Sequence, residues 1–275
     1  MIFAAPQYVV LFHYFRQFLE EAHRCGIDVV PLKGAHLLTS VYPAASVERG
    51  PMTDVDFLVR PTDVSLAHEI LIELGFVREA DHALKDSHET AYVLEVNPKE
   101  RIVFEMHEGL SRFSMDLEGL WRRTRVSTFD GVPCRRLSPE DAYVYAVLHE
   151  TLHRLSDLDR LIGDLTMLLH SGEVQPPLVL ERAREWRLTR AVWTVSRLVP
   201  IDKGTEGKMS KMLRLLEPPF PINQILRHLV PNRRGTLISQ LPYRLQAVLL
   251  WGWILDSPTQ VVKRILSHPV FGRRH

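Results

Sequence analysis

The chain has 275 residues, 45% of them hydrophobic and 24% charged, a balance typical of globular proteins that excludes low-complexity and collagen-like chains. Its 34 Lys and Arg residues nearly balance its 33 Asp and Glu residues, so bulk charge gives no support to nucleic-acid binding. Two cysteines exclude a disulfide framework. With no signal-peptide pattern and no apolar run of about 20 residues, we expect a soluble cytoplasmic protein without a membrane partner.

The first half of the chain mixes helical and extended patterns. Apolar residues at helical spacing that end before Gly26 predict the first helix, and β-branched or alternating runs predict the strands. In chain order we expect a helix over 8–25, a strand over 27–32, a helix over 35–41, a strand over 54–59, a helix over 61–75, strands over 90–96 and 101–107 joined by a turn, and a hairpin over 126–137 around an Asp-Gly turn.

The second half is almost entirely helical in pattern. Ser138 and Pro139, followed by two acids, are typical of a helix N-terminus, and Pro- and Gly-rich breaks then separate six or seven expected helices. The apolar stretch 247–255 is too short to cross a bilayer and predicts a buried helix. We therefore expect an α+β protein, with a mixed sheet and flanking helices in residues 1–137 and an all-helical domain in residues 138–275.

The most informative segment is R-G-P-M-T-D-V-D-F-L-V at residues 49–59. Side chains alternate along a strand, so Asp54 and Asp56 share one face and Val55 and Phe57 share the other. Two neighbouring carboxylates repel one another unless a cation neutralises them, and hard oxygen ligands suit Mg²⁺. A D-x-D pair alone is more often two solvated acids at the end of a strand, so the motif needs further support.

A third acid on another expected strand supplies part of that support. Glu105 and His107 share one face of the run V-F-E-M-H, where an acid among apolar residues needs a partner. If this strand lies beside the strand of Asp54 and Asp56, the three carboxylates form a cluster able to hold two metal ions.

A candidate phosphate-binding turn gives the D-x-D motif further support. Lys33 and Gly34 stand between a β-like run and a helix. Such a turn offers backbone N–H groups and the positive end of a helix to a phosphate. The Lys33 side chain adds one positive charge, and Arg49 could supply a second.

These motifs together carry a resemblance. P-L-K-G, then R-x-x-x-x-D-V-D-F-L-V, then E-x-H, resembles the uncharacterised nucleotidyltransferase-like family of the polymerase β superfamily. H-E-T-L-H followed by L-D-R-L-I-G-D is similar to a helix pair of that family, so the resemblance covers roughly residues 27–170. By position, the superfamily's metal-binding carboxylates match Asp54, Asp56 and Glu105. The usual Gly-Ser phosphate turn is replaced here by Lys33-Gly34.

The resemblance implies a polymerase β-like domain that performs two-metal nucleotidyl transfer, an activity of EC 2.7.7 type. The three carboxylates would hold two Mg²⁺ ions with a nucleoside triphosphate such as ATP, and an acceptor hydroxyl would attack the α-phosphorus and release pyrophosphate. Lys33 and Arg49 would bind phosphates, and Glu105 or His107 would take the acceptor proton. The near-neutral charge favours a small molecule, a peptide or a protein over long RNA as acceptor.

A competing motif lies in the helical half. His149, Glu150 and His153 form a literal H-E-x-x-H, the arrangement of zinc hydrolases with Glu as general base. The extended zinc motif fails, because Ser156 and Asp159 stand where a Gly and a third His would be required. A zinc-dependent hydrolase is therefore the less favoured alternative.

Two further interpretations stay open at this point. His149 and His153 either contribute to the nucleotide or acceptor pocket, or pack as half-buried histidines hydrogen-bonded to Asp164. The whole chain could also be a non-catalytic nucleotide-binding protein, although three clustered carboxylates disfavour that.

Overall fold

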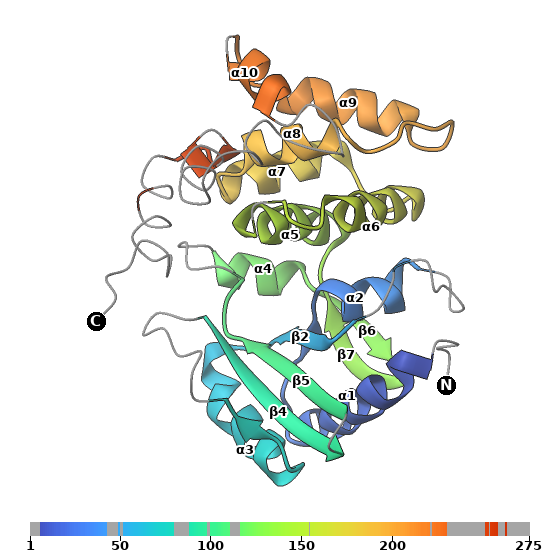
Figure 1. Cartoon of the computed structure of the whole chain (residues 1–275), viewed down its shortest axis with the longest axis vertical. Coiled ribbons are helices and arrows are strands. Elements are labelled where there is room, and N and C mark those ends of the chain that lie inside the picture. Colours follow the sequence, from blue (N-terminus) through green and yellow to red (C-terminus); the bar gives the residue numbers. More distant parts are fainter. Residues whose placement is uncertain are drawn as a thin grey trace. The chain divides into compact units, whose positions relative to one another are not determined.

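The computed structural model describes residues 6–42, 49, 52–79, 88–97, 100–110, 116–153, 155–220, 222–229, 251–252, 254–257 and 262. The chain divides into two compact units, Met1–Ser138 and Pro139–His275, coloured blue to green and green to red in Figure 1. The described strands all belong to the first unit, and the second is helical. This confirms the α+β class and the mixed sheet. That each unit is a domain that folds independently, with a boundary at residue 137, stays a prediction.

The first unit contains a mixed five-stranded sheet in the order β1-β2-β5-β4-β3. β2 and β5 are parallel neighbours, and the other pairs are antiparallel. The elements are α1 (Pro6–Arg24), β1 (Val30–Pro31), α2 (Lys33–Ser40), β2 (Asp54–Leu58), the 3₁₀ turn η1 (Pro61–Asp63), α3 (Val64–Glu73), β3 (Val77–Arg78), β4 (Glu89–Asn97), β5 (Glu100–His107), α4 (Leu117–Arg123), β6 (Arg125–Phe129) and β7 (Val132–Arg136).

One face of the sheet is covered by α1. Phe15 and Phe18 on this helix pack against Phe57 of β2, with ring centroids 5.6 and 4.7 Å away, and against Phe104 of β5. Alternation along the strands then leaves the polar residues of β2 and β5 on the opposite face. The apolar half of the D-V-D-F-L pattern therefore builds the core, and the acidic half faces away from it.

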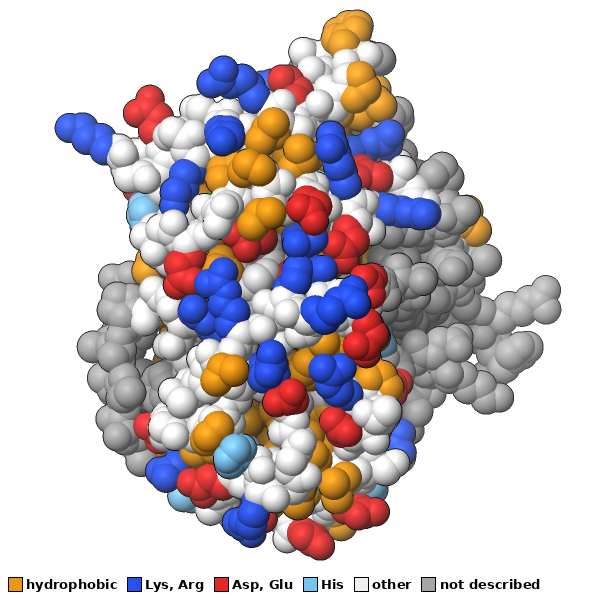
Figure 2. All heavy atoms as spheres, turned by 180° about the vertical axis from the view of Figure 1, so that it is seen from behind, with side chains coloured by type: hydrophobic (Ala, Val, Ile, Leu, Met, Phe, Trp, Pro, Cys, Tyr) orange, Lys and Arg blue, Asp and Glu red, His pale blue; other side chains and the backbone are white. Residues whose placement is uncertain are grey.

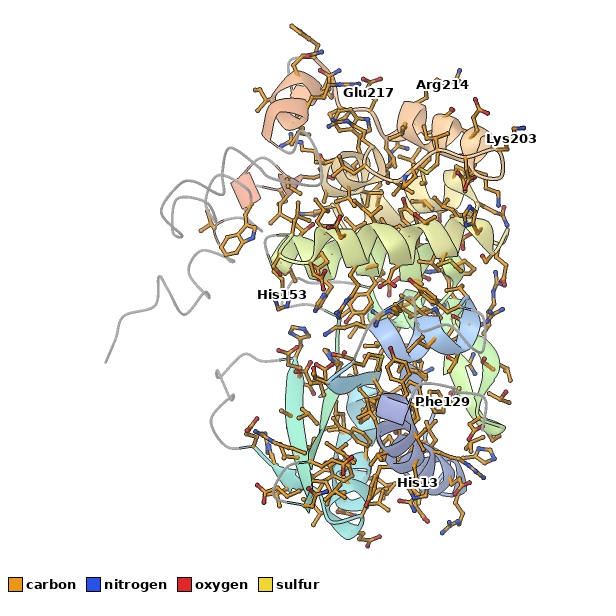
Figure 3. All side chains as sticks on the ribbon, turned by 45° about the vertical axis from the view of Figure 1, so that its right-hand side comes forward. His13, Phe129, His153, Lys203, Arg214 and Glu217 are labelled. Carbon is orange, nitrogen blue, oxygen red and sulfur yellow. The ribbon has the colours of Figure 1, made fainter. Side chains whose placement is uncertain are left out.

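The Asp-Gly hairpin is a separate two-stranded sheet formed by β6 and β7. It is anchored to α1 by Phe129, which is labelled in Figure 3 and meets the rings of Phe12 and Phe15 edge-on at 5.0 Å. The amide of Arg135 donates to the carbonyl of Val29, which ties the hairpin to the segment before β1.

The second unit contains α5 (Pro139–Leu152), α6 (Leu158–His170), α7 (Pro176–Glu185), α8 (Thr189–Ser196), α9 (Glu206–Leu216) and α10 (Ile222–Leu229). α5 packs against α6, α7 and α8, and α9 packs against α7 and α8. Trp186, Trp193 and Trp251 are buried in this unit, and Trp253 lies outside the described residues. Among the helices of the described residues, none combines the length and apolar character needed to cross a membrane.

Local differences from the sequence predictions have physical reasons. The strand expected over 27–32 is reduced to β1, and the carbonyl of Val29 just before it accepts the amide of Arg135 from the hairpin. The helix expected over 61–75 begins as the 3₁₀ turn η1 before α3. The short elements α4 and β3 were not predicted: α4 has seven residues, and Asp116 caps it by accepting from the amide of Gly119.

Candidate active site

Two acids of the candidate site stand side by side on the parallel strands at the centre of the sheet. The β2–β5 register pairs Asp56 with Glu105 and Asp54 with Val103. Paired residues on neighbouring strands project to the same face, so Asp56 and Glu105 share the face opposite the Phe57 core. The side chain of Asp56 is 4% exposed and that of Glu105 is 30% exposed. One acid is therefore buried and the other is accessible to solvent.

Lys33 is held against these two acids. Its Nζ lies 2.6 Å from Oδ1 of Asp56 and 3.7 Å from Oε2 of Glu105. The chain reaches this place because β1 pairs with β2 and the amide of Leu32 donates to the carbonyl of Asp56 at 2.8 Å. Lys33 then begins α2 with a φ of +45°, a left-handed conformation that a residue with a Cβ adopts only at a cost.

Gly34 and Arg49 meet beside Lys33. A Cβ atom built on Gly34 would collide with the side chain of Met52 and with the guanidinium of Arg49. The absence of a side chain at Gly34 therefore lets Arg49 approach the backbone of the turn. The two cations expected to bind phosphate, Lys33 and Arg49, thus come to the same turn.

His107 is bound to the buried acid of the pair. Its side chain is 2% exposed, and its Nε2 lies 3.0 Å from Oδ1 of Asp56. An ionised carboxylate only accepts hydrogen bonds, so Nε2 of His107 is the donor. His107 stands two residues after Glu105 on β5, which puts both on the polar face of the sheet.

The two carboxyl groups have opposite pKa shifts. Burial alone raises the pKa of Asp56, but the charge of Lys33 and the hydrogen bond from His107 outweigh burial and leave this pKa well below its ordinary value. Burial, and then the negative charge of Asp56, raise the pKa of Glu105 to about 8. Of these two acids, Glu105 is therefore the one that retains a proton more readily, while Asp56 carries the negative charge.

The donor set is suited to a divalent cation. Within the described residues, Asp56, Glu105 and His107 each offer a ligand atom, and these atoms lie within 4.8 Å of one another. Two carboxylates that open to solvent through Glu105 are the hard oxygen ligands that Mg²⁺ takes together with water and phosphate. Asp54 lies outside this group of three, although its charge also raises the pKa of Glu105.

The two histidines of the H-E-x-x-H motif lie in the helical unit. Their rings are 4.4 Å apart, and Figure 3 shows His153 at the end of α5. Glu150 lies 3.5 Å from Nδ1 of His149 and accepts the amide of Asp157 at 3.2 Å, so its carboxylate joins α5 to the start of α6. Of the groups of three possible metal ligands among the described residues, none includes these histidines. A role for them in substrate binding stays a prediction.

Sequence reasoning did not single out His88 and Glu89, which the structure places beside His107. The predicted turn between β4 and β5 partly indicates this neighbourhood, because a hairpin brings together residues that lie equally far from its turn. A register shift between Glu95 and Asn97 moves the alignment by one residue and brings Glu89 opposite His107. That irregularity leaves no mark in the sequence pattern.

Among known proteins, a family model described as uncharacterised nucleotidyltransferase matches residues 3–200 of the chain. No curated protein matches the chain. Two solved structures are similar to it. The structure of the antibiotic-resistance factor ANT(2'')-Ia is 12% identical with a TM-score of 0.42, and the similarity covers 59% of this chain and 84% of that chain. The structure of an antigenic nucleotidyltransferase-like protein from Paracoccidioides brasiliensis is 14% identical with a TM-score of 0.45, and the similarity covers 75% of this chain and 94% of that chain.

Proposed function

The chain belongs to the uncharacterised nucleotidyltransferase family, and from that premise we propose that it transfers a nucleoside monophosphate from a nucleoside triphosphate to an acceptor hydroxyl in a Mg²⁺-dependent reaction. The observation that carries the proposal is the register of β2 and β5, which sets Asp56 beside Glu105 on the polar face of the sheet with Lys33 against both. Family membership makes the chain a nucleotidyltransferase. What we propose beyond this is the dependence on Mg²⁺, the roles of the site residues and the class of acceptor.

The acids have a clear place in such a reaction. Asp56 and Glu105, with Asp54 two residues before Asp56 on the same strand, would hold two Mg²⁺ ions. When bound, the ions supply positive charge to the phosphate oxygens as the bond to pyrophosphate breaks. Because the pKa of Glu105 is raised to about 8, a metal ion bound there at neutral pH would displace a proton from this carboxyl group.

The remaining residues of the site bind and orient the substrate. Lys33 and Gly34 form a turn that the guanidinium of Arg49 approaches, and the two positive side chains suit the β- and γ-phosphates of the donor. The acceptor oxygen bonds to the α-phosphorus, the bond to the leaving pyrophosphate breaks, and the acceptor proton passes to a base. Glu105 is the candidate base, because the Nε2–H of His107 is donated to Asp56 and holds that acid in position.

The distribution of charge on the surface of the described residues indicates which class of acceptor to expect. On the face drawn in Figure 2, basic and acidic side chains alternate over short distances, in keeping with the formal charge of +1. Long RNA is bound by continuous basic surfaces that neutralise many phosphates. A small molecule, a peptide or a protein side chain is therefore the acceptor that we favour.

Calorimetric titration of the full-length protein with each of the four nucleoside triphosphates, with and without Mg²⁺, tests the site. We expect one nucleotide to bind in the presence of Mg²⁺, and Asp56→Asn and Glu105→Gln to weaken this binding at least about 100-fold. Asp63→Asn, in η1 of the same unit, is the matched control and should bind like wild type. Binding that is indifferent to Mg²⁺ and to both site variants would contradict the proposal.

Pyrophosphate release separates a transferase from a protein that only binds nucleotide. Water can stand in for the acceptor hydroxyl, so slow release is expected from wild type and Asp63→Asn and none above background from Asp56→Asn. Nucleotide binding with no release from any of the three proteins would favour the non-catalytic alternative.

A further inference from the structure

A second group of possible metal ligands lies at the beginning of β4. Within the described residues, His88, Glu89 and His107 each offer one ligand atom, and these atoms lie within 4.8 Å of one another. Oε2 of Glu89 is 3.7 Å from Nε2 of His88 and 3.8 Å from Nδ1 of His107. The group adjoins the acids of the candidate active site and shares His107 with them, but it uses the other nitrogen of that ring.

The hydrogen bond of His107 decides which of its nitrogens is available. Nε2 donates to Asp56, which places the ring proton on Nε2 and leaves a lone pair on Nδ1. Nδ1 is buried and has no hydrogen-bond partner in the part of the chain that the structure describes. A histidine whose second nitrogen donates to a carboxylate is the usual form of a metal ligand, because that hydrogen bond sets both the tautomer and the ring orientation.

The spacing of the three ligand atoms suits a metal ion better than direct contact. The distances of 3.7 and 3.8 Å are too long for hydrogen bonds, which end near 3.2 Å. In a tetrahedral zinc site with bonds of about 2.0 to 2.1 Å, neighbouring ligand atoms lie about 3.3 to 3.4 Å apart. A contraction of a few tenths of an ångström would bring each imidazole nitrogen to this distance from Oε2 of Glu89, and all three ligand atoms already lie within 4.8 Å of one another.

The backbone holds the ligands in this arrangement. The β4–β5 register places Glu89 opposite His107, and the amide of Glu108 donates to the carbonyl of His88 at 2.9 Å. The side chains of His88 and Glu89 are 20% and 45% exposed, so an ion can enter from solvent and keep a water as its fourth ligand.

We propose that His88, Glu89 and His107 form a zinc site, distinct from the magnesium site of the proposed transfer reaction. Two imidazole nitrogens and one carboxylate are borderline ligands that favour Zn²⁺, whereas Mg²⁺ prefers oxygen ligands and water. Asp56 serves both sites. It offers oxygen to one ion and, through the Nε2–H of His107, orients a ligand of the other.

Zinc titration of the metal-stripped full-length protein tests this site, in excess Mg²⁺ and without nucleotide, so the result does not depend on the transfer reaction. We expect one Zn²⁺ per chain, and a loss of affinity of at least about 100-fold in His88→Gln and in Glu89→Gln. His149→Gln is the matched control, since it removes a histidine of the H-E-x-x-H motif, and it should bind zinc like wild type. Circular dichroism of each variant checks that the fold is retained.

Three outcomes would overturn the proposal. They are no zinc binding by wild type, equal binding by wild type and both site variants, or a loss of binding in His149→Gln alone. X-ray absorption at the zinc edge of the wild-type complex gives a readout that needs no variant. It should report two imidazoles and oxygen ligands without sulfur, and a spectrum with fewer than two imidazoles would contradict the assignment.

Discussion

Lys33 is where backbone strain and charge meet in the candidate site. Its φ of +45° costs on the order of 1 to 3 kcal/mol for a residue with a Cβ. Such strain persists only where the surroundings determine the conformation. Here the β1–β2 pairing positions the preceding residue, and the ion pair with Asp56 holds the side chain. A strained lysine against two acids is typical of a functional site, and it occurs where the sequence predicted a phosphate turn.

His36 gives a prediction at the same scale. Burial, and then the charge of Arg136, lower its pKa from 6.5 to about 4. Between pH 6.5 and pH 4 the unfolded chain therefore binds a proton that the folded chain does not, so stability is lost as the pH falls through this window. The free energy of unfolding is about 3 kcal/mol higher above pH 6.5 than below pH 4 on account of this residue.

Urea unfolding of wild type and His36→Gln at several pH values measures this. The free energy of unfolding of wild type should fall more steeply below pH 6.5 than that of the variant, by up to about 1.4 kcal/mol per pH unit. Parallel pH profiles for the two proteins would show that His36 titrates normally in the fold.

The start of α8 shows how one element depends on a distant one. Its N-cap residue, Leu188, has no side chain able to accept a hydrogen bond. The carboxylate of Asp256 takes that place and accepts the amides of Thr189 and Arg190 at 2.6 and 3.0 Å. A residue more than sixty positions later in the chain thus caps the helix, and local sequence patterns do not reveal it.

We expect Asp256→Ala to destabilise the protein by about 1 to 2 kcal/mol, because two amides of α8 lose their acceptor and the negative charge leaves the helix N-terminus. Asp256→Asn should lose less, since an amide oxygen still accepts. Chemical denaturation measures the difference. The control is Glu69→Ala on the exposed face of α3, expected within about 0.5 kcal/mol of wild type. An Asp256→Ala protein as stable as this control would contradict the capping role.

Element prediction from the sequence succeeded where a pattern was long or a turn was strong. The expected helix over 8–25 and the strands around Asp54 and Glu105 are present as α1, β2 and β5, and the Asp-Gly turn joins β6 and β7. Elements that depend on their neighbours were missed or misjudged in length. β3 and β1 have two residues each and are defined by their pairing with β4 and β2. Pairing partners far away in the sequence are not part of a local pattern.

At the scale of the whole molecule, the family match and the first structural unit end at different residues. The match runs over residues 3–200, whereas the first unit ends at Ser138, so the matched length includes the first helices of the second unit. The proposed metal and phosphate ligands nevertheless all lie within the first unit.

Production of residues 1–138 and 139–275 as separate fragments tests the predicted domain division. We expect both to unfold cooperatively, because each has its own buried core, and we expect residues 1–138 to retain Mg²⁺-dependent nucleotide binding. Circular dichroism and calorimetry provide the measurements, with the Asp56→Asn fragment as control. A first fragment that is unfolded, while the full chain is folded, would contradict the division.

The sequence by itself determined the fold class of this protein and the set of candidate site residues. It determined the α+β class, because the helical and alternating patterns are local, and the candidate acids and cations, because residue type and spacing within a segment are directly legible. Only the tertiary structure decided which of them meet. The β2–β5 register pairs Asp56 with Glu105, and Asp54 stands outside the compact group. The shift near Glu95 brings Glu89 to His107. Such contacts depend on pairing between distant strands, whose register is set by packing and backbone hydrogen bonds rather than by any one segment.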